Sequence, residues 1–345
     1  MGGTRIQGCD LPGYRGVVTP NRPIISLLGA HDVPAPYNLA AIEQLATVRQ
    51  CTAETLAEAL PGSDVLVLWD FFSRGLRDNW GPATSKLRWV HVCAAGVDSL
   101  MFDELAASEV VVTNARGVFD QSIAEFVLAS IMARHKRIHE SRRLQKRGVW
   151  RHRETTRTAG TSALVIGTGG IGRATARLLR AVGIDVAGAG RAERSNDPDF
   201  GIVHASDRLR DYVGDFDTVI AIAPLTADTR GMIDAAVFDA MEPTAHFINV
   251  GRGQLVDEPA LVDALRTGAI AAATLDVFDV EPLPADSPLW PMDQVSISAH
   301  MSGDVVGWRD VLADQVLDNL RRYLDAAELR NVVDTARGYV PGGGR

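Results

Sequence analysis

Short apolar runs alternate with segments of helical spacing in the first third of the chain. Four of these runs are bounded by polar or turn-forming residues, as is typical of buried strands: IISLLG at 24–29, DVLVLW at 64–69, LRWVHV at 87–92 and VVVTN at 110–114. Residues 37–60 carry apolar side chains at three- and four-residue steps, which predicts a helix. Alternating strands and helices predict a parallel sheet covered by helices.

A second alternating series follows an apolar helix predicted from Ser122 to His135. It contains six strand-like runs, which are TSALVIG from 161, IDVAGAG from 184, DTVIAIA from 217, AHFINVG from 245, ATLDVF from 273 and VSISAH from 295. Six strands separated by helical patterns predict a complete doubly wound sheet. A last amphipathic helix, predicted from Val311 to Leu324, lies beyond this sheet, and we expect it to return to the first domain.

Composition and charge exclude several classes of protein. The chain has 345 residues, of which 46% are hydrophobic and 23% charged, as expected for a globular protein with two cores. The formal net charge is -8 and the basic residues are mixed with acidic ones, so we expect no nucleic-acid partner. No run approaches the ~18 apolar residues that span a bilayer, and the stretch after Met1 lacks the apolar core of a signal peptide. We therefore expect a cytoplasmic protein with no membrane partner.

The cysteines indicate neither metal binding nor redox chemistry. Cys9, Cys51 and Cys93 are far apart, with no C-x-x-C motif and no paired histidine spacing. We expect them to be reduced structural thiols, and we expect no metal site.

A glycine-rich loop joins the strand at 163–166 to the following predicted helix. The loop comprises Gly167, Thr168, Gly169, Gly170, Ile171 and Gly172. In this context the first glycine allows a tight turn, the second lets the backbone approach a pyrophosphate, and the last lets the helix pack on the strand. An ordinary glycine-rich turn is the alternative, which the strand and helix on either side disfavour.

The end of the next strand bears on the choice of nucleotide. An NAD-binding protein usually places a carboxylate there to accept the ribose hydroxyls, but this strand ends at Gly190. Arg191 and Arg194 follow, and two guanidinium groups suit a 2′-phosphate. We therefore predict that NADP(H) is favoured over NAD(H). Two solvated arginines, with Glu193 as the ribose ligand, remain the alternative.

Three later segments place reactive side chains just past strand ends. INVGRG carries Arg252, LDVFDVEP carries Asp276 and Glu281, and SAHMSG carries His300. Ligands bind at the carboxyl ends of strands in a doubly wound sheet, so we expect these side chains to lie together. A cation, a proton donor and an acid that holds the donor are what reduction of a ketone on an anionic substrate requires.

These motifs closely resemble the D-isomer-specific 2-hydroxyacid dehydrogenase family, in particular its glyoxylate/hydroxypyruvate reductase branch. The resemblance covers nearly the whole chain and also includes AGVD at 95–98, TN at 113–114, AEF at 124–126 and PLT at 224–226. It implies a Rossmann-type doubly wound parallel sheet inserted into a flavodoxin-like α/β substrate domain. The expected boundaries are 115–302 for the dinucleotide-binding domain, and 1–114 with 303–345 for the substrate-binding domain. It also implies a homodimer built on the nucleotide domain, for which the apolar helix from Ser122 is a further indication.

The resemblance assigns a role to each reactive side chain. His300 would be the general acid in reduction, Glu281 would hydrogen-bond His300 and favour its protonated form, and Arg252 would orient the substrate carboxylate and polarise its carbonyl. The substrate carboxylate would also bind backbone amides of Ala95, Gly96 and Val97. Asp276 would hold the nicotinamide carboxamide, and further cofactor contacts are implied for Pro224, Thr229, Val250 and Gly303. A core histidine, a surface salt bridge and a helix cap are the structural alternatives, which the shared order of the motifs disfavours.

Two features separate this chain from the common family pattern. Ala299 stands where the family often has proline, and the stretch from Ser302 to Arg309 is atypical, so the substrate side chain stays open. Formate dehydrogenases share the architecture but use glutamine at the position of Glu281, which disfavours formate oxidation here. A corepressor-like protein, in which nucleotide governs peptide binding, is the other alternative, and the intact arginine, glutamate and histidine disfavour it.

Overall fold

The chain divides into two compact units. The computed structural model describes residues 22–71 and 73–341. Unit 1 comprises Met1–Ala115 and Arg309–Ala336, and unit 2 comprises Arg116–Trp308 and Arg337–Arg345. Residues 303–308 and the segment from Arg337, which the sequence assigned to the first domain, thus group with unit 2.

Unit 1 is built on a parallel sheet of five strands in the order β2-β1-β3-β4-β5. Its strands are β1 (Ile24–Leu28), β2 (Thr47–Cys51), β3 (Val65–Leu68), β4 (Trp89–Val92) and β5 (Val111–Asn114). This is the flavodoxin-like strand order. The prediction of a flavodoxin-like α/β domain is therefore confirmed.

The single helix predicted over residues 37–60 is wrong. The segment forms α1 (Leu39–Leu45), the edge strand β2 and the short helix α2 (Leu56–Ala59). β2 pairs with β1 along its whole length, from Ile24 opposite Thr47 to Leu28 opposite Cys51. Tertiary pairing with the buried strand β1 thus overrides the local helical spacing. β2 is a partly exposed edge strand and carries no alternating pattern that would reveal it.

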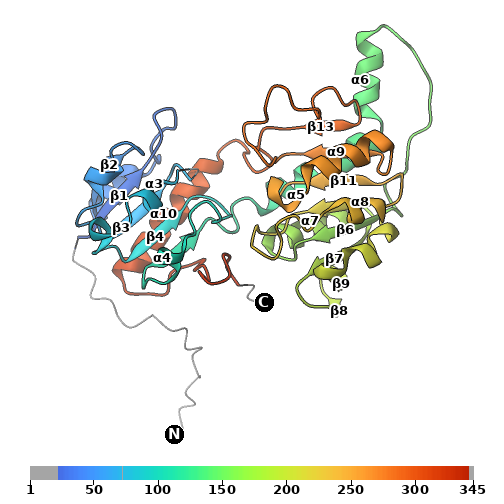
Figure 1. Cartoon of the computed structure of the whole chain (residues 1–345). Helices are drawn as coiled ribbons and strands as arrows, with labels where there is room; N and C mark the ends of the chain where they lie inside the picture. The colour runs from blue at the N-terminus through green and yellow to red at the C-terminus, as the bar shows by residue number, and fades with distance from the viewer. Residues whose placement is uncertain (1–21, 72, 342–345) are drawn as a thin grey trace. The chain divides into compact units, whose positions relative to one another are not determined.

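Helices complete unit 1. They are α3 (Gly75–Asp78), α4 (Asp103–Ala106) and the long α10 (Trp308–Leu324), with a 3-10 turn η1 (Pro82–Thr84). The ring of Tyr323 on α10 stacks on Trp89 of β4 at 5.5 Å between centroids. Asn38 donates a hydrogen bond of 2.9 Å to the Ala313 carbonyl. These contacts hold α10 against the sheet (Figure 1).

Unit 2 contains an eight-stranded sheet in the order β13-β12-β11-β10-β6-β7-β9-β8. Its strands are β6 (Ser162–Ile166), β7 (Asp185–Gly190), β8 (Arg194–Asp197), β9 (Gly201–Ala205), β10 (Thr218–Ala221), β11 (His246–Asn249), β12 (Ala272–Leu275) and β13 (Val295–Ile297). All pairs are parallel except β8 with β9. The order reverses between β6 and β10, so the predicted doubly wound, Rossmann-type sheet is confirmed.

Strands β8 and β9 were not predicted. They form an antiparallel hairpin at the sheet edge, with a bulge between Ser195 and Asp197. β8 has the polar sequence RSND, and a mostly exposed edge strand of this kind lacks the apolar alternation that would signal it.

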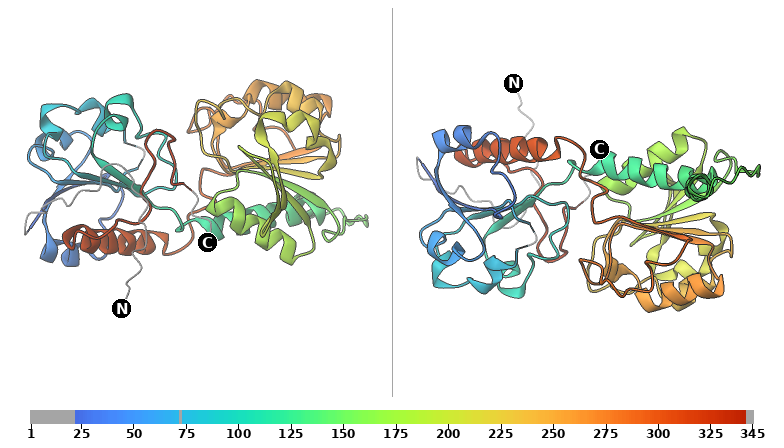
Figure 2. Two further views of the ribbon diagram at one scale, coloured as in Figure 1. Left: turned by 90° about the horizontal axis from the view of Figure 1, so that it is seen from below. Right: turned by 90° about the horizontal axis from the view of Figure 1, so that it is seen from above.

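Helices cover both faces of the unit 2 sheet (Figure 2). α5 (Asp120–His135) and α7 (Gly170–Ala181) lie on one face, and α8 (Ala235–Asp239) and α9 (Glu258–Thr267) on the other. The remaining elements are α6 (Ile138–Lys146) and the 3-10 turns η2 (Ser206–Asp211), η3 (Val213–Asp215) and η4 (Gly253–Leu255). The apolar side chains Ile123, Val127 and Ile131 of α5 are buried inside the unit, so they no longer serve as an indication of a dimer.

Three sequence expectations concern a membrane-spanning helix, a metal site and the state of the cysteines. Within 22–71 and 73–341 no helix has the length and apolar character needed to cross a membrane. The same residues contain no group of histidine, cysteine and carboxylate side chains arranged to hold a metal ion. Cys51 and Cys93 are buried free thiols, and burial raises the pKa of Cys51 to about 11. Cys9 and the stretch after Met1 lie outside the described residues.

Candidate active site

The glycine-rich loop leaves β6 and enters α7. Gly167 has a φ of +119°, and a Cβ on it would lie 2.7 Å from the Ala223 nitrogen. A Cβ on Gly172 would lie 1.9 Å from the Gly167 carbonyl oxygen, so neither position can carry a side chain. Gly169 has no heavy atom within 4 Å of its Cβ position and faces open space. The loop therefore has the cradle that a pyrophosphate group needs.

A carboxylate that belongs to none of the sequence motifs lies beside the first turn of α7. Oδ2 of Asp120 would be 2.4 Å from a Cβ on Gly170. Burial raises the pKa of Asp120, and the charge of Arg116 offsets this only in part. Ile171 follows in the same turn and is half-buried.

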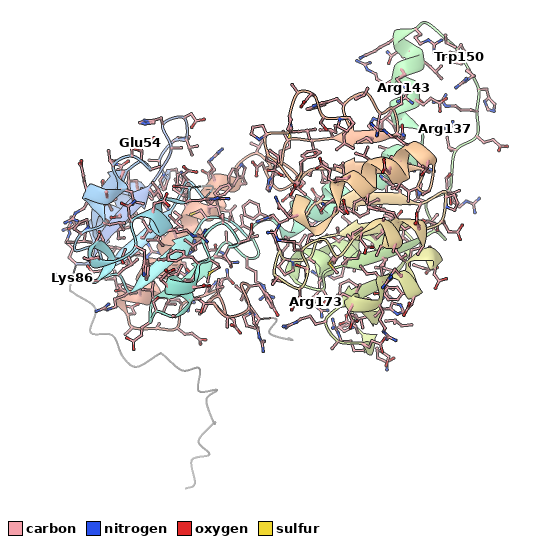
Figure 3. All side chains as sticks on the ribbon, in the orientation of Figure 1. Glu54, Lys86, Arg137, Arg143, Trp150 and Arg173 are labelled. Atoms are coloured by element: carbon pink, nitrogen blue, oxygen red, sulfur yellow. The ribbon has the colours of Figure 1, made fainter. Side chains whose placement is uncertain are left out.

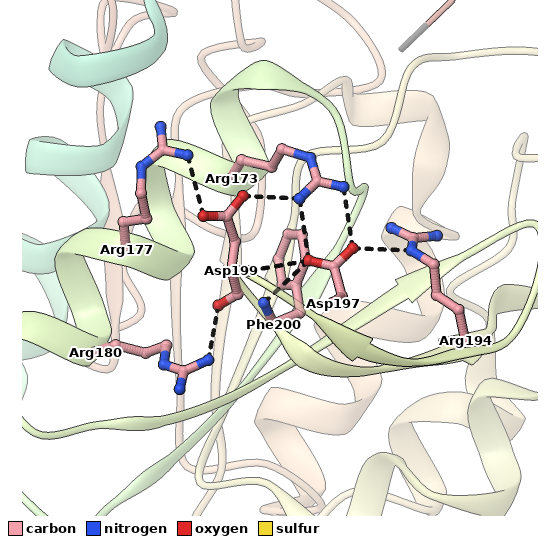
Figure 4. A network of polar contacts seen from close by, with 7 residues as sticks. All are labelled: Arg173, Arg177, Arg180, Arg194, Asp197, Asp199 and Phe200. Atoms are coloured by element: carbon pink, nitrogen blue, oxygen red, sulfur yellow. Dashed lines mark hydrogen bonds and ion pairs between the residues drawn. The ribbon is translucent and has the colours of Figure 1, made fainter. Parts of the chain in front are cut away.

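Arg194, the first residue of β8, forms an ion pair with Asp197 of the same hairpin (Figure 4). Its Nε donates to Oδ2 of the buried Asp197 at 2.9 Å, and Arg173 of α7 donates to both oxygens of the same carboxylate at 3.0 Å. Burial raises the pKa of Asp197, but these hydrogen bonds outweigh it and hold the pKa well below the usual range. Asp199 extends the network to Arg173, Arg177 and Arg180. The network joins the hairpin to α7.

Arg191, just past β7, has different surroundings. Its guanidinium lies over the ring of Tyr339, 5.2 Å from the centroid. Glu193, the alternative ribose ligand, forms an ion pair with Arg208. Of the two arginines predicted to bind a 2′-phosphate, Arg191 is therefore the one that no carboxylate engages within the described residues.

His300 and Glu281 are in direct contact. Oε2 of Glu281 accepts a hydrogen bond from Nδ1 of His300 at 2.7 Å, and Oε1 accepts one from the Phe278 N–H at 2.9 Å. Burial raises the pKa of Glu281, but the two hydrogen bonds and the positive charges of His300 and Arg252 outweigh it. The net pKa is lowered, so the carboxylate is ionised at neutral pH.

The loop that carries His300 is held by Asp276. His300 has a φ of +50°, which an L-residue rarely adopts, and its N–H donates to the Asp276 carbonyl at 2.8 Å. The fully buried Asp276 carboxylate accepts from Ser298 Oγ at 2.5 Å, Met301 N at 3.0 Å and Ser302 N at 2.9 Å. Asp276 therefore fixes an unfavourable backbone conformation at the reactive histidine.

Close packing brings the Arg252 loop against the Glu281 turn. Arg252 follows β11, and its carbonyl accepts a hydrogen bond of 2.9 Å from Asn249 Nδ2. A Cβ on Gly253 would lie 1.9 Å from the Phe278 carbonyl carbon, so only glycine permits this approach. Arg252, Glu281 and His300 thus lie near one another beyond the carboxyl ends of β11, β12 and β13.

The other predicted cofactor residues line neighbouring loops of unit 2. Pro224 accepts a hydrogen bond from Thr229 Oγ1 at 2.7 Å, in the loop after β10. The Val250 N–H donates to Ala221 at 3.1 Å, just after β11. A Cβ on Gly303 would lie 2.8 Å from Cδ1 of Phe119.

The predicted substrate loop belongs to unit 1. Ala95, Gly96 and Val97 follow β4, and the Ala95 carbonyl accepts a hydrogen bond of 2.6 Å from Asn114 Nδ2. The Val97 carbonyl accepts the N–H groups of Leu100 and Met101, both at 3.0 Å. The loop is thus held through its carbonyl groups.

A phosphate cradle at the switch point of a doubly wound sheet, followed by an acid-held histidine, is the arrangement of a nucleotide-dependent oxidoreductase. Comparison with known proteins defines the class more closely. Residues 128–302 match the model of the D-isomer specific 2-hydroxyacid dehydrogenase NAD-binding domain. The chain belongs to the D-isomer specific 2-hydroxyacid dehydrogenase family and is an NAD(P)-dependent oxidoreductase of 2-hydroxy and 2-keto acids.

Relatives cover most of the chain. Glyoxylate/hydroxypyruvate reductase B of Escherichia fergusonii is 30% identical over 305 residues, which span 85% of this chain and 91% of that protein. A D-isomer specific 2-hydroxyacid dehydrogenase from Xanthobacter autotrophicus, solved with NADPH and MES, is 30% identical with a TM-score of 0.77 and covers 92% of this chain and 100% of its own. An NADPH-dependent glyoxylate/hydroxypyruvate reductase from Sinorhizobium meliloti, solved with NADP and sulfate, is 25% identical with a TM-score of 0.78 and the same two coverages, 92% and 100%.

Proposed function

We propose that this enzyme is a 2-keto acid reductase in which His300 is the proton donor. The observation that carries the proposal is the hydrogen bond between Nδ1 of His300 and the ionised carboxylate of Glu281. An ionised acceptor at Nδ1 fixes the orientation of the ring and stabilises its positive charge. Proton transfer to the substrate is then assigned to Nε2.

Reduction requires a hydride at the 2-carbon of the keto acid and a proton at its carbonyl oxygen. A nicotinamide held by the loops of unit 2 would supply the hydride. His300 would donate its proton to the carbonyl oxygen as the carbonyl electron pair moves to that oxygen, which gives the 2-hydroxy acid. Arg252 is assigned to the substrate carboxylate and to the negative charge that develops on the carbonyl oxygen. Ala95, Gly96 and Val97 are assigned to the carboxylate through their N–H groups.

The cofactor is assigned to the loops of unit 2. The open space at Gly169 and the side-chain-free positions Gly167 and Gly172 fit a pyrophosphate. We assign Gly170, Ile171, Pro224, Thr229, Val250 and Gly303 to cofactor contacts as well. The buried Asp276 is assigned to the nicotinamide carboxamide in addition to its hold on the His300 loop.

We further propose that NADP(H) is favoured over NAD(H). No carboxylate engages Arg191 among the described residues, whereas Glu193 is neutralised by Arg208 and Asp197 by Arg173 and Arg194. Little negative charge therefore opposes a 2′-phosphate beside β7. The Xanthobacter and Sinorhizobium structures, which hold NADPH and NADP, support the same preference.

Replacing Arg191 with alanine is expected to raise the Michaelis constant for NADPH by about ten- to a hundredfold. A charge-assisted hydrogen bond contributes roughly 1.5–3 kcal/mol, which NADPH loses in this variant. NADH has no 2′-phosphate, so its Michaelis constant should hardly change. Steady-state kinetics with both reduced cofactors would measure the effect. Arg194→Ala is the matched control, because Asp197 already holds Arg194, and it should alter cofactor discrimination less. A higher efficiency of the wild type with NADH than with NADPH would contradict the preference.

The reductase proposal is tested with a panel of 2-keto acids, among them glyoxylate, hydroxypyruvate and hydroxyphenylpyruvate, which the names of the relatives suggest. We expect consumption of reduced cofactor with at least one of them, and no oxidation of formate. Chiral analysis of the product should give the D-hydroxy acid. A protein that binds NADPH tightly and reduces none of the panel would contradict the proposal.

We also propose that the enzyme is a homodimer that uses the α6 arm, residues 138–150, of unit 2. Trp150 is fully exposed, and Ile138 and Val149 are 53% and 41% exposed, on a helix and loop that project from their unit (Figures 1 and 3). Exposed apolar side chains on a projecting arm suit contact with a partner chain. The triple variant Ile138→Ser, Val149→Ser, Trp150→Ser is expected to halve the mass measured by sedimentation. A monomeric wild type at all concentrations would contradict the proposal.

A further inference from the structure

The C-terminal segment from Arg337 to Pro341 belongs to unit 2, although it follows the last helix of unit 1. Arg116 anchors it by donating from Nη1 to the carbonyl oxygens of Val340 at 3.4 Å and Pro341 at 3.1 Å. The anchored segment carries the ring of Tyr339 to the guanidinium of Arg191, 5.2 Å from its centroid. A residue near the end of the chain thus touches the side chain that follows β7.

The contact with the Tyr339 ring leaves hydrogen-bond donors of the Arg191 guanidinium available. The guanidinium is attracted to the π face of the tyrosine ring, and arginine carries five N–H donors that lie in the guanidinium plane and point outward. Because the ring contacts one side of the guanidinium, the N–H groups on the other side are able to donate hydrogen bonds to a phosphate. It also restricts a long side chain that would otherwise occupy many rotamers.

The hydroxyl of Tyr339 has no part in this arrangement. It is buried, and it has no hydrogen-bond partner within the described residues. A buried hydroxyl without a partner is unfavourable, so its removal should be neutral or stabilising. The useful part of the side chain is therefore the ring.

We propose that Tyr339 is a positioning residue for cofactor selectivity, which holds Arg191 with its N–H edge presented to the 2′-phosphate of NADP(H). The proposal rests on the proposed preference for NADP(H). It gives the C-terminal segment a role in recognising the adenosine end of the cofactor.

The test is the ratio of kcat/KM with NADPH to kcat/KM with NADH. Tyr339→Ala and Tyr339→Leu are expected to lower this ratio about two- to fivefold, the value of an exposed cation–π contact, whereas Tyr339→Phe keeps the wild-type ratio. Leucine retains apolar bulk, so it separates loss of the ring from loss of packing. In an Arg191→Ala background, Tyr339→Ala should change the ratio no further. Tyr37→Ala, which removes an exposed tyrosine of unit 1, is the control and should leave the ratio unchanged.

The outcomes distinguish failure of the role of Tyr339 from failure of the proposed preference for NADP(H). If the wild-type ratio lies below one, the NADP(H) preference fails, and if Arg191→Ala leaves the ratio unchanged, the role of Arg191 in it fails; in both cases the role of Tyr339 fails as well. If Arg191→Ala lowers the ratio but Tyr339→Ala and Tyr339→Leu do not, only the role of Tyr339 is overturned. A rise in the ratio with Tyr339→Ala, or an equal loss in the presence and absence of Arg191, overturns it as well.

Discussion

Replacing His300 with alanine is expected to lower the turnover number for keto acid reduction by about 10²- to 10⁴-fold, the usual contribution of a positioned proton donor. The substrate carbonyl would then have to take its proton from water. The Asp276 contacts to the loop involve the backbone of residues 300–302 and the Ser298 hydroxyl, so the loop itself should persist. Single-turnover rates with saturating NADPH measure the chemical step, and near-wild-type turnover in this variant would sink the mechanism.

Glu281→Gln is the companion variant, and its pH dependence identifies the role of the carboxylate. The folded pKa of Glu281 lies below the ordinary value of 4.5, so the ionised form and its contribution are present above that value. The contribution is lost as the pH falls through the lowered folded pKa. Turnover of the wild type should therefore show an acidic limb that glutamine removes, with a lower plateau at neutral pH. An identical acidic limb in both proteins would exclude Glu281 as its source.

Two alanine substitutions in the phosphate loop are expected to affect different properties, one the stability of the fold and the other the affinity for NADPH. Gly172→Ala should lower the free energy of unfolding by about 3 kcal/mol, the upper end of the cost of overpacking, because its Cβ would lie 1.9 Å from a backbone oxygen. Gly169→Ala should leave stability unchanged or slightly higher, because Gly169 has a φ of -78° and open space around it. Its Cβ would instead occupy the pyrophosphate site and weaken NADPH binding by roughly ten- to a hundredfold.

Thermal unfolding followed by circular dichroism, together with fluorescence titration of NADPH, distinguishes these two effects. Gly172→Ala should unfold several degrees lower, whereas Gly169→Ala should keep the wild-type midpoint and lose affinity. Two variants that lose stability alike would show that Gly169 serves the fold. Two that keep stability and affinity would place the cofactor elsewhere.

The sequence by itself determined the class of fold and the family of oxidoreductases. Buried parallel strands carry continuous apolar runs, which is why the local pattern predicts β1, β3 to β6 and β10 to β12. The less buried β7 and β13 also carry short apolar runs and are predicted as well. The predicted catalytic side chains lie within a few residues of strand ends, as Arg252 does after β11. Strand order then implies that such residues meet, which is why Arg252, Glu281 and His300 were predicted together.

The tertiary structure decided what local pattern cannot encode. Edge strands β2 and β8 carry mixed polar residues and are defined by the neighbour they pair with, so the local pattern predicts a helix over β2 and no strand at β8. Contacts between residues far apart in the chain leave no periodic signal, and Asp197 with Arg173, Asp276 with its loop, and Tyr339 with Arg191 are of this kind. The sequence does not show whether an arginine near the ribose position contacts a carboxylate or an aromatic ring. Only the tertiary structure shows that Arg194 is bound by a carboxylate and that Arg191 lies over a ring.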